Sequence, residues 1–114
     1  VYAASDIFIM PSSYEPCGLS QLIALKYGSI PVVRETGGLK DTVIPFNKYT
    51  KQGNGLTFKN FNAHELLFPI IRALGYYADS VVWESLVRNA MESDYGWSRS
   101  AKAYADLYQR VLKK

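Results

Sequence analysis

The sequence has few of the residues that build disulfide frameworks and metal centres. Its 114 residues include one cysteine, Cys17, and one histidine, His64. A single cysteine cannot form an intramolecular disulfide, and it leaves no set of thiolates for a zinc site. A single histidine likewise argues against a histidine-based metal centre. We therefore expect no metal and no cofactor, and so little cysteine is typical of a reducing compartment.

Long apolar runs and clusters of basic charge are also absent. No segment approaches the roughly 18–20 apolar residues that a membrane-spanning helix needs, and the first residues lack the pattern of a signal peptide. Thirteen Lys and Arg against ten Asp and Glu give a formal net charge of +3 without a basic stripe. Nucleic-acid binding usually needs such a stripe. We expect no nucleic-acid partner, no membrane partner and a cytoplasmic location, or a plastid if the source is a plant.

What the sequence does contain is a pattern of short strands and helices. Residues 7–10 form an apolar run closed by Pro11, which predicts a strand buried on both faces of a parallel sheet. Residues 18–27 place apolar side chains at helical spacing before Gly28, and residues 30–34 predict a second strand. A strand, a helix and a strand in this order are typical of a right-handed βαβ unit.

The next segment predicts a turn, a loop and a third strand. Residues 36–43 look like a glycine turn that opens a short helix, and residues 44–53 are polar enough for a surface loop. Residues 55–58 form a weaker strand. The predicted sheet therefore has about three short parallel strands.

The second half of the chain predicts three helices. Asn62 as N-cap and Glu65 form a capping box at the start of the first, whose buried face would carry Leu66, Ile70 and Leu74. A second helix begins near residue 80, with an apolar stripe at positions 83, 86, 87, 90 and 91.

The last helix begins near Ser98. We expect Tyr104 and Tyr108 on it to pack in the core, and Trp97 to fill a gap between this helix and the body of the protein. About five helices are more than so small a sheet covers symmetrically. The chain also opens without Met, so we expect a piece of a longer protein: the C-terminal half of a doubly wound α/β domain whose earlier strands precede Val1.

Two of the predicted turns share a construction that is typical of phosphate sites. At residues 17–19 and 37–39 a buried strand is followed by glycine and then by a helix N-terminus. The first helical turn presents N–H groups without internal partners and about half a positive charge, and glycine lets a ligand approach the backbone. Both turns would lie at the carboxyl ends of parallel strands. Either turn taken alone could equally be a structural bend.

Glu15 favours the functional interpretation of the first turn. Its carboxylate lies close to the predicted phosphate position, where it would repel an anion. Such an acid is expected to hold hydroxyl groups or positive charge instead.

Three strings in the sequence make a family resemblance specific. Residues 11–22 (PSSYEPCGLSQL), 27–34 (YGSIPVVR) and 36–43 (TGGLKDTV) resemble the bacterial glycogen synthase and plant starch synthase family of retaining GT-B glycosyltransferases. The resemblance extends to residues 95–98 and so covers nearly the whole chain. Many related GT-B enzymes carry a second glutamate where this chain has Ile23, and the synthases that use ADP-glucose typically lack it.

The resemblance implies a set of site residues. Glu15 would be catalytic, contacting hydroxyls of the donor glucose near the reacting carbon. Substrate-binding residues would come from both turns and are Cys17, Gly18, Leu19, Ser20, Thr36, Gly37 and Gly38. The amides of residues 17–19 would hold sugar hydroxyls and the distal phosphate, Ser20 would face the diphosphate, and residues 36–38 would line the same pocket.

The resemblance also implies an architecture and an activity. Residues 1–114 would be a partial C-terminal nucleotide-sugar-binding domain, the C-terminal half of a Rossmann-like fold, in a two-domain GT-B enzyme. That enzyme would transfer glucose from ADP-glucose to the non-reducing end of an α-1,4-glucan acceptor with retention. The N-terminal domain and the Arg and Lys that clamp the diphosphate would lie outside these residues, so the chain alone is expected to be inactive. Arg34 and Lys40 are expected to be solvated charges.

Two other functions stay open at this point. The chain could be a non-catalytic α/β module, flavodoxin-like or regulatory, that binds a phosphate or a partner protein. It could also belong to a GT-B transferase with another donor. A non-catalytic module would need neither Glu15 nor two matched glycine turns.

Overall fold

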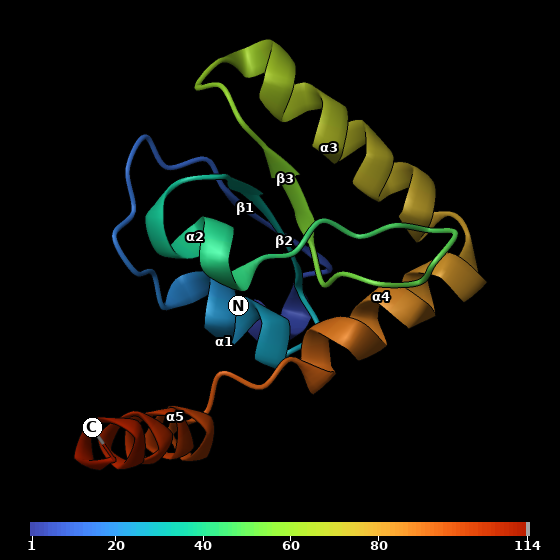
Figure 1. Ribbon diagram of the computed structural model, residues 1–114. Helices are drawn as coiled ribbons and strands as arrows, with labels where there is room; N and C mark the ends of the chain where they lie inside the picture. Colours follow the sequence, from blue (N-terminus) through green and yellow to red (C-terminus); the bar gives the residue numbers. More distant parts are fainter. Residues whose placement is uncertain (114) are drawn as a thin grey trace.

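The computed structural model describes residues 1–113 and is built on a three-stranded parallel sheet (Figure 1). The strands are β1 (Ile7–Met10), β2 (Ile30–Arg34) and β3 (Leu56–Phe58), in the spatial order β1-β2-β3. Ile7 pairs with Ile30, and Val32 pairs with Leu56. β2 is buried along most of its length because it has a strand on each side and helices on both faces. The predicted α/β class and the parallel sheet are confirmed.

The prediction that β1 is buried on both faces is wrong. β1 lies at the edge of the sheet, and the side chain of Ile9 is 44% exposed. Among residues 1–113 no strand pairs with its outer edge and no helix covers Ile9. An apolar run predicts burial only when the neighbouring elements are present to cover it.

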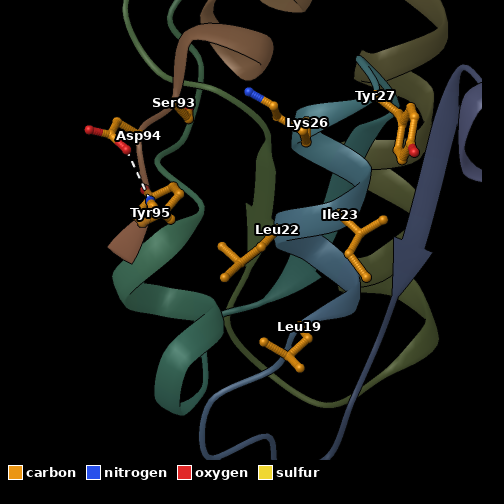
Figure 2. A pocket seen from close by; sticks show the side chains of 9 residues that line it. Leu19, Leu22, Ile23, Lys26, Tyr27, Ser93, Asp94 and Tyr95 are labelled. Atoms are coloured by element: carbon orange, nitrogen blue, oxygen red, sulfur yellow. Dashed lines mark hydrogen bonds between the residues drawn. The ribbon is translucent and has the colours of Figure 1, made fainter. Parts of the chain in front are cut away.

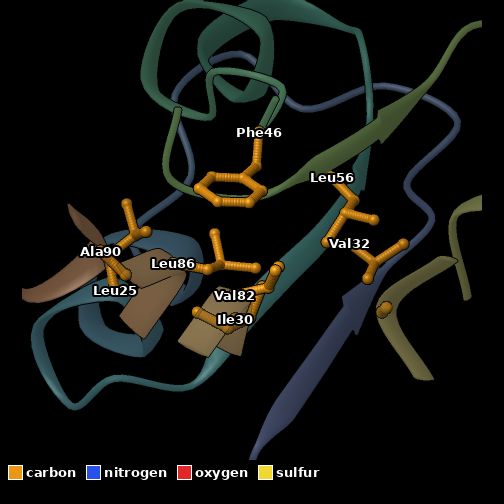
Figure 3. Close-up of a cluster of buried hydrophobic side chains, with 9 residues drawn as sticks. Leu25, Ile30, Val32, Phe46, Leu56, Val82, Leu86 and Ala90 are labelled. Carbon is orange, nitrogen blue, oxygen red and sulfur yellow. The ribbon is translucent and has the colours of Figure 1, made fainter. Parts of the chain in front are cut away.

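Two side-chain clusters on opposite faces of β2 form the core. Alternation along the strand sends Val32 into the larger cluster and Val33 into the smaller one. The larger cluster (Figure 3) joins the sheet to helices α1 (Ser20–Lys26), α3 (Ala63–Tyr77) and α4 (Ser80–Glu92). Its buried members are Leu25, Ile30, Val32, Phe46, Leu56, Ala73, Val82, Leu86 and Ala90.

The smaller cluster fixes helix α2 (Gly37–Thr42) against the other face of β2. It contains Val33, Leu39 and Val43, with Met10 of β1 packed against it. α2 follows β2 directly, so this contact holds the start of α2 close to the carboxyl end of the strand that precedes it. Packing on both faces of β2 thus positions the starts of α1 and α2 at the edge of the sheet formed by the carboxyl ends of its strands.

Helix α3 begins where the capping pattern predicted. The Oδ1 atom of Asn62 accepts the N–H of Glu65 at 2.9 Å. The Glu65 carboxylate accepts the backbone N–H groups of Lys59 (3.2 Å) and Asn60 (2.7 Å), so it fastens the preceding loop rather than completing a capping box. α3 continues through Pro69.

The predicted buried face of α3 is partly wrong. Leu66 and Ile70 pack against the core, but Leu74 is 56% exposed and the next contact comes from Ala73. The contact line of α3 therefore continues from Ile70 to Ala73, a step of three residues, rather than to Leu74, a step of four. Helix α4 agrees better with its predicted stripe, since Leu86 and Ala90 are fully buried.

Helix α5 (Trp97–Leu112) stands apart from the rest of the molecule (Figure 1). None of its residues is buried. Trp97 is 90% exposed, and Tyr104 and Tyr108 are 61% and 62% exposed. The predictions that Trp97 fills a gap and that the two tyrosines lie in the core are therefore wrong. Helical spacing shows which face is apolar, whereas a partner surface decides whether that face is buried.

The overall dimensions agree with this isolated helix. The accessible surface is 7706 Å², against about 6,300 Å² for a compact protein of this mass. The radius of gyration is 15.6 Å, against about 13 Å for a compact chain of this length. Over residues 1–113, none of the helices combines the length and the apolar character that crossing a membrane requires.

Candidate functional site

The loop between β1 and α1 carries the first glycine turn, which in the structure comprises residues 15–19 and so includes Glu15. Glu15 is half-buried on this loop, while Tyr14 and Cys17 are exposed. Gly18 has φ +73°, a conformation that L side chains rarely adopt. Helix α1 then begins at Ser20, and its N-cap, Leu19, provides no side-chain hydrogen bond. The amides at the start of α1 therefore have no side-chain acceptor of the usual kind.

The connection between β2 and α2 carries the second glycine turn, which in the structure comprises residues 36–38. Thr36, the N-cap of α2, also provides no side-chain hydrogen bond, and Gly37 has φ +44°. A Cβ atom on Gly37 would collide with the carbonyl oxygen of Glu15, and one on Gly38 would collide with that of Cys17. The second turn thus approaches the first so closely that only glycine fits.

Hydrogen bonds join the two turns as well. The Gly38 N–H donates to the carbonyl oxygens of Glu15 (3.2 Å) and Pro16 (3.0 Å). Both turns follow the carboxyl ends of neighbouring parallel strands, which is where open α/β sheets bind ligands. The structure therefore brings all eight predicted site residues to one edge of the sheet. The roles of these residues stay a prediction.

Arg34 has a structural role that the sequence analysis missed. It was expected to be solvated, but it is half-buried at the carboxyl end of β2. Its Nη1 donates to the Ser13 carbonyl (2.7 Å) and its Nε donates to the Lys59 carbonyl (3.1 Å). Arg34 thus ties the loop after β1 to the loop after β3, whereas Lys40 is exposed as expected. The position of Arg34 at the end of an apolar strand was the available signal in the sequence.

Gln21 and Thr42 are two further residues that sequence reasoning missed as part of the site. In the sequence Gln21 lies within the family string and Thr42 within a predicted short helix, and neither position indicates a site residue. Their side chains lie between the two turns and hydrogen-bond to backbone atoms of both. No pattern in the sequence pairs residues 21 positions apart.

A groove of about 430 Å³ lies beside α1 (Figure 2). Leu22 on α1 points toward the segment of residues 93–96 that leads to α5, whereas Ile23 and Tyr27 point away from that segment. Lys26 and Asp94 add one charge of each sign to a mostly apolar lining. Such a lining does not suit a diphosphate, which needs several hydrogen-bond donors and net positive charge. The groove and the glycine turns share only Leu19, so the turns are the better candidate for an anion.

A comparison with protein families identifies the chain. Residues 1–77 match the family model described as glycosyl transferases group 1. The chain belongs to this family. Among curated proteins it is 62% identical over 113 residues to the glycogen synthase of Bacillus cytotoxicus, covering 99% of this chain and 24% of that protein. It is 56% identical over 114 residues to the glycogen synthase of Geobacillus stearothermophilus, covering 100% of this chain and 24% of that protein.

Solved structures of glycosyltransferases share the fold of this chain. The catalytic domain of starch synthase IV from Arabidopsis thaliana, bound to ADP and acarbose, matches with a TM-score of 0.85 at 43% identity, over 99% of this chain and 24% of that one. Sucrose-phosphate synthase from Thermosynechococcus elongatus matches with a TM-score of 0.72 at 30% identity, over 98% of this chain and 27% of that one. The predicted glycogen and starch synthase family is confirmed. The chain spans about a quarter of the length of these relatives.

Proposed function

We propose that this chain is part of the nucleotide-sugar-binding domain of a glucan synthase. The whole protein would transfer glucose from ADP-glucose to the non-reducing end of an α-1,4-glucan, with retention at the anomeric carbon. The observation that carries the proposal is the 62% identity to a glycogen synthase over 99% of this chain. The interlocked glycine turns support it, since they gather the implied donor-site residues at one edge of the sheet.

The chemistry of the site follows from two charges that develop as the donor breaks. The departing diphosphate gains negative charge, and in this proposal the backbone amides of residues 17–19 together with Ser20 would stabilise it. The sugar ring gains positive charge, and the Glu15 carboxylate would stabilise that through its negative charge. Thr36, Gly37 and Gly38 would line the same pocket.

The donor proposal rests on two observations. The matched starch synthase IV structure is bound to ADP, which supports an adenine nucleotide. Ile23 stands where many other GT-B enzymes have a second glutamate, and that also favours ADP-glucose. The match to sucrose-phosphate synthase is weaker in both TM-score and identity. We further propose that the whole protein works in the cytoplasm, because the curated relatives named above are from bacteria.

A chimaera tests the function directly. Residues 1–114 of this chain replace the matching segment of the Geobacillus stearothermophilus glycogen synthase, to which they are 56% identical over their full length. We expect the chimaera to transfer glucose from ADP-glucose to glycogen, and to prefer ADP-glucose over UDP-glucose. A folded chimaera without transfer activity would refute the glucan synthase proposal, and a preference for UDP-glucose would refute the donor.

The chain by itself provides the matching control. We expect the 114-residue protein to show no transfer, because the reaction needs donor and acceptor held in line within a closed cleft. Transfer to glycogen by the chain alone would show that the site is complete in these residues. In the chimaera, Glu15→Ala is expected to abolish transfer while leaving the fold intact.

A further inference from the structure

One polar side chain lies fully buried between the two glycine turns. Gln21 on α1 has no accessible surface. Its Nε2 donates to the carbonyl oxygens of Cys17 (3.1 Å) and Gly18 (2.9 Å), and it also reaches Oγ1 of Thr42 on α2 at 3.3 Å. The Thr42 hydroxyl in turn donates to the Gly38 carbonyl at 2.7 Å. A chain of hydrogen bonds therefore runs from the first turn through two side chains to the second.

The other end of the Gln21 amide has no partner. Its Oε1 is buried without a hydrogen bond and lies where a Cβ atom on residue 18 would be, a space that is open because Gly18 has no side chain. The opposite orientation of the amide would place this oxygen against two carbonyl oxygens, so the orientation is determined by its surroundings. An unpartnered buried oxygen costs stability, whereas an apolar side chain of similar shape would fill the space without that cost. Packing alone therefore does not explain a glutamine here.

Thr42 connects this arrangement to the body of the protein. Its carbonyl oxygen accepts the hydroxyl of Tyr95 at 2.6 Å and the Nδ2 of Asn54 at 3.1 Å. Tyr95 belongs to the segment that leads into α5, and Asn54 is buried in the loop before β3. Thr42 is thus held from two sides while its hydroxyl reaches toward the turns.

We propose that Gln21 and Thr42, here called the brace, are positioning residues that hold the two glycine turns at one fixed separation. That the brace serves donor binding rests on the proposed function. That the brace fixes the separation of the two turns does not rest on it. Backbone amides stabilise a developing charge only when they are fixed in place before the reaction. With the brace, the two turns keep one fixed separation, so the backbone that would line the donor pocket is in place before the donor binds; without it, the turns move apart.

The first experiment needs no ligand. Amide hydrogen exchange is measured by NMR on the chain and on Gln21→Met and Thr42→Val, with the exposed Gln52→Met and Thr50→Val as controls. The Gly38 N–H reports the contact between the turns, because it donates to Glu15 and Pro16. Ile30 is the first residue of β2, and its N–H donates to the carbonyl oxygen of Asp6 just before β1. Exchange of the Ile30 N–H reports global unfolding.

We expect the Gly38 amide to exchange about tenfold faster or more in the two brace variants, with Ile30 changed much less. Thr42→Ser keeps the hydroxyl that Thr42→Val removes, so we expect its Gly38 amide to exchange as slowly as in the unmodified chain. Equal acceleration at Gly38 and Ile30 would show a loss of stability only, and an unchanged Gly38 would show that the turns hold together without the brace. Either result would overturn the proposal.

The second experiment uses the chimaera described above. Gln21→Met is expected to lower kcat/KM for ADP-glucose about 10- to 100-fold, while KM for glycogen stays within about twofold of the Gln52→Met control. Donor kinetics equal to those of the control would refute the positioning role even if Gly38 exchange is faster. An inactive chimaera with the native brace would instead count against the proposed function, and the exchange experiment would still decide whether the brace exists.

Discussion

The two glycine turns meet at one edge of the sheet, but they are held in different ways. The second turn is fixed by backbone against backbone, because the space beside Gly37 and Gly38 is filled by the carbonyls of Glu15 and Cys17. Gly18 in the first turn meets a side chain instead, because the atoms nearest the position of its missing Cβ all belong to Gln21. Backbone atoms cannot move without moving the strand they follow, whereas a side chain can rotate. Gly37 and Gly38 should therefore tolerate substitution less than Gly18.

Gly38→Ala should give the largest effect on stability, because it places a methyl group against the Cys17 backbone. We expect the free energy of unfolding to fall by about 3 kcal/mol or more, as for strong overpacking. Urea denaturation followed by circular dichroism measures this loss. A loss below about 1 kcal/mol would show that the turns can move apart easily, and would remove the difference between them.

Glu15→Gln tests the chemistry that only the first turn carries. In the chimaera we expect kcat to fall by about 100-fold with little change in KM for ADP-glucose, because a neutral amide cannot stabilise positive charge on the sugar ring. Steady-state kinetics with both substrates varied provide the measurement. Near-normal kcat for Glu15→Gln, with Glu15→Ala far worse, would mean that Glu15 only orients the sugar through hydrogen bonds.

Gly18→Ala should cost less stability than Gly38→Ala. The positive φ of Gly18 costs an L residue about 1–2 kcal/mol, and the Gln21 side chain must also shift. A double-mutant cycle with Gln21→Ala separates the two contributions, since that background leaves only the backbone cost. Equal costs in both backgrounds would show that Gln21 does not restrict the first turn.

Gly75→Ala is the reference for a glycine outside both turns. Nothing lies within 4 Å of a Cβ at this position, which is in the last turn of α3. We expect the free energy of unfolding to rise by about 0.5–1 kcal/mol, because alanine favours the helix. A destabilised Gly75→Ala would mean that the losses at Gly18 and Gly38 are not specific to the turns.

Glu65 should give the smallest effect, because its half-buried carboxylate holds only the short loop before α3. Hydrogen bonds from the Asn60 backbone and side chain, with help from Lys59, hold the pKa of this carboxyl below its ordinary value. A lowered folded-state pKa contributes stability that is present above the unfolded pKa and is lost as pH falls through the folded one. Urea midpoints between about pH 6 and pH 3 should therefore fall less steeply for Glu65→Gln than for the wild type. If the urea midpoint fell equally steeply with pH in Glu65→Gln and in the wild type, the Glu65 carboxylate would not stabilise the loop.

Much of the fold could be predicted because its signals are local. The Asn62 cap, the left-handed Gly28 and the apolar runs of β1 and β2 each lie within a few residues of the structure they determine. The site could be predicted in part for the same reason, since each turn directly follows its strand. The edge position of β1 and the contact line of α3 could not be predicted from the sequence. Both depend on which strands and helices pack beside these elements in the folded protein.

The sequence by itself determined the strands, the helix boundaries, the two glycine turns and the family, because backbone propensity, capping and motif spacing act between near neighbours in the chain. Only the tertiary structure decided that Gln21 meets Thr42, that Arg34 ties two loops together, and that Trp97 lies in solvent. These outcomes depend on contacts between residues far apart in sequence, and on whether a surface exists to cover an apolar face. Such contacts form only when the sheet brings its loops to one edge.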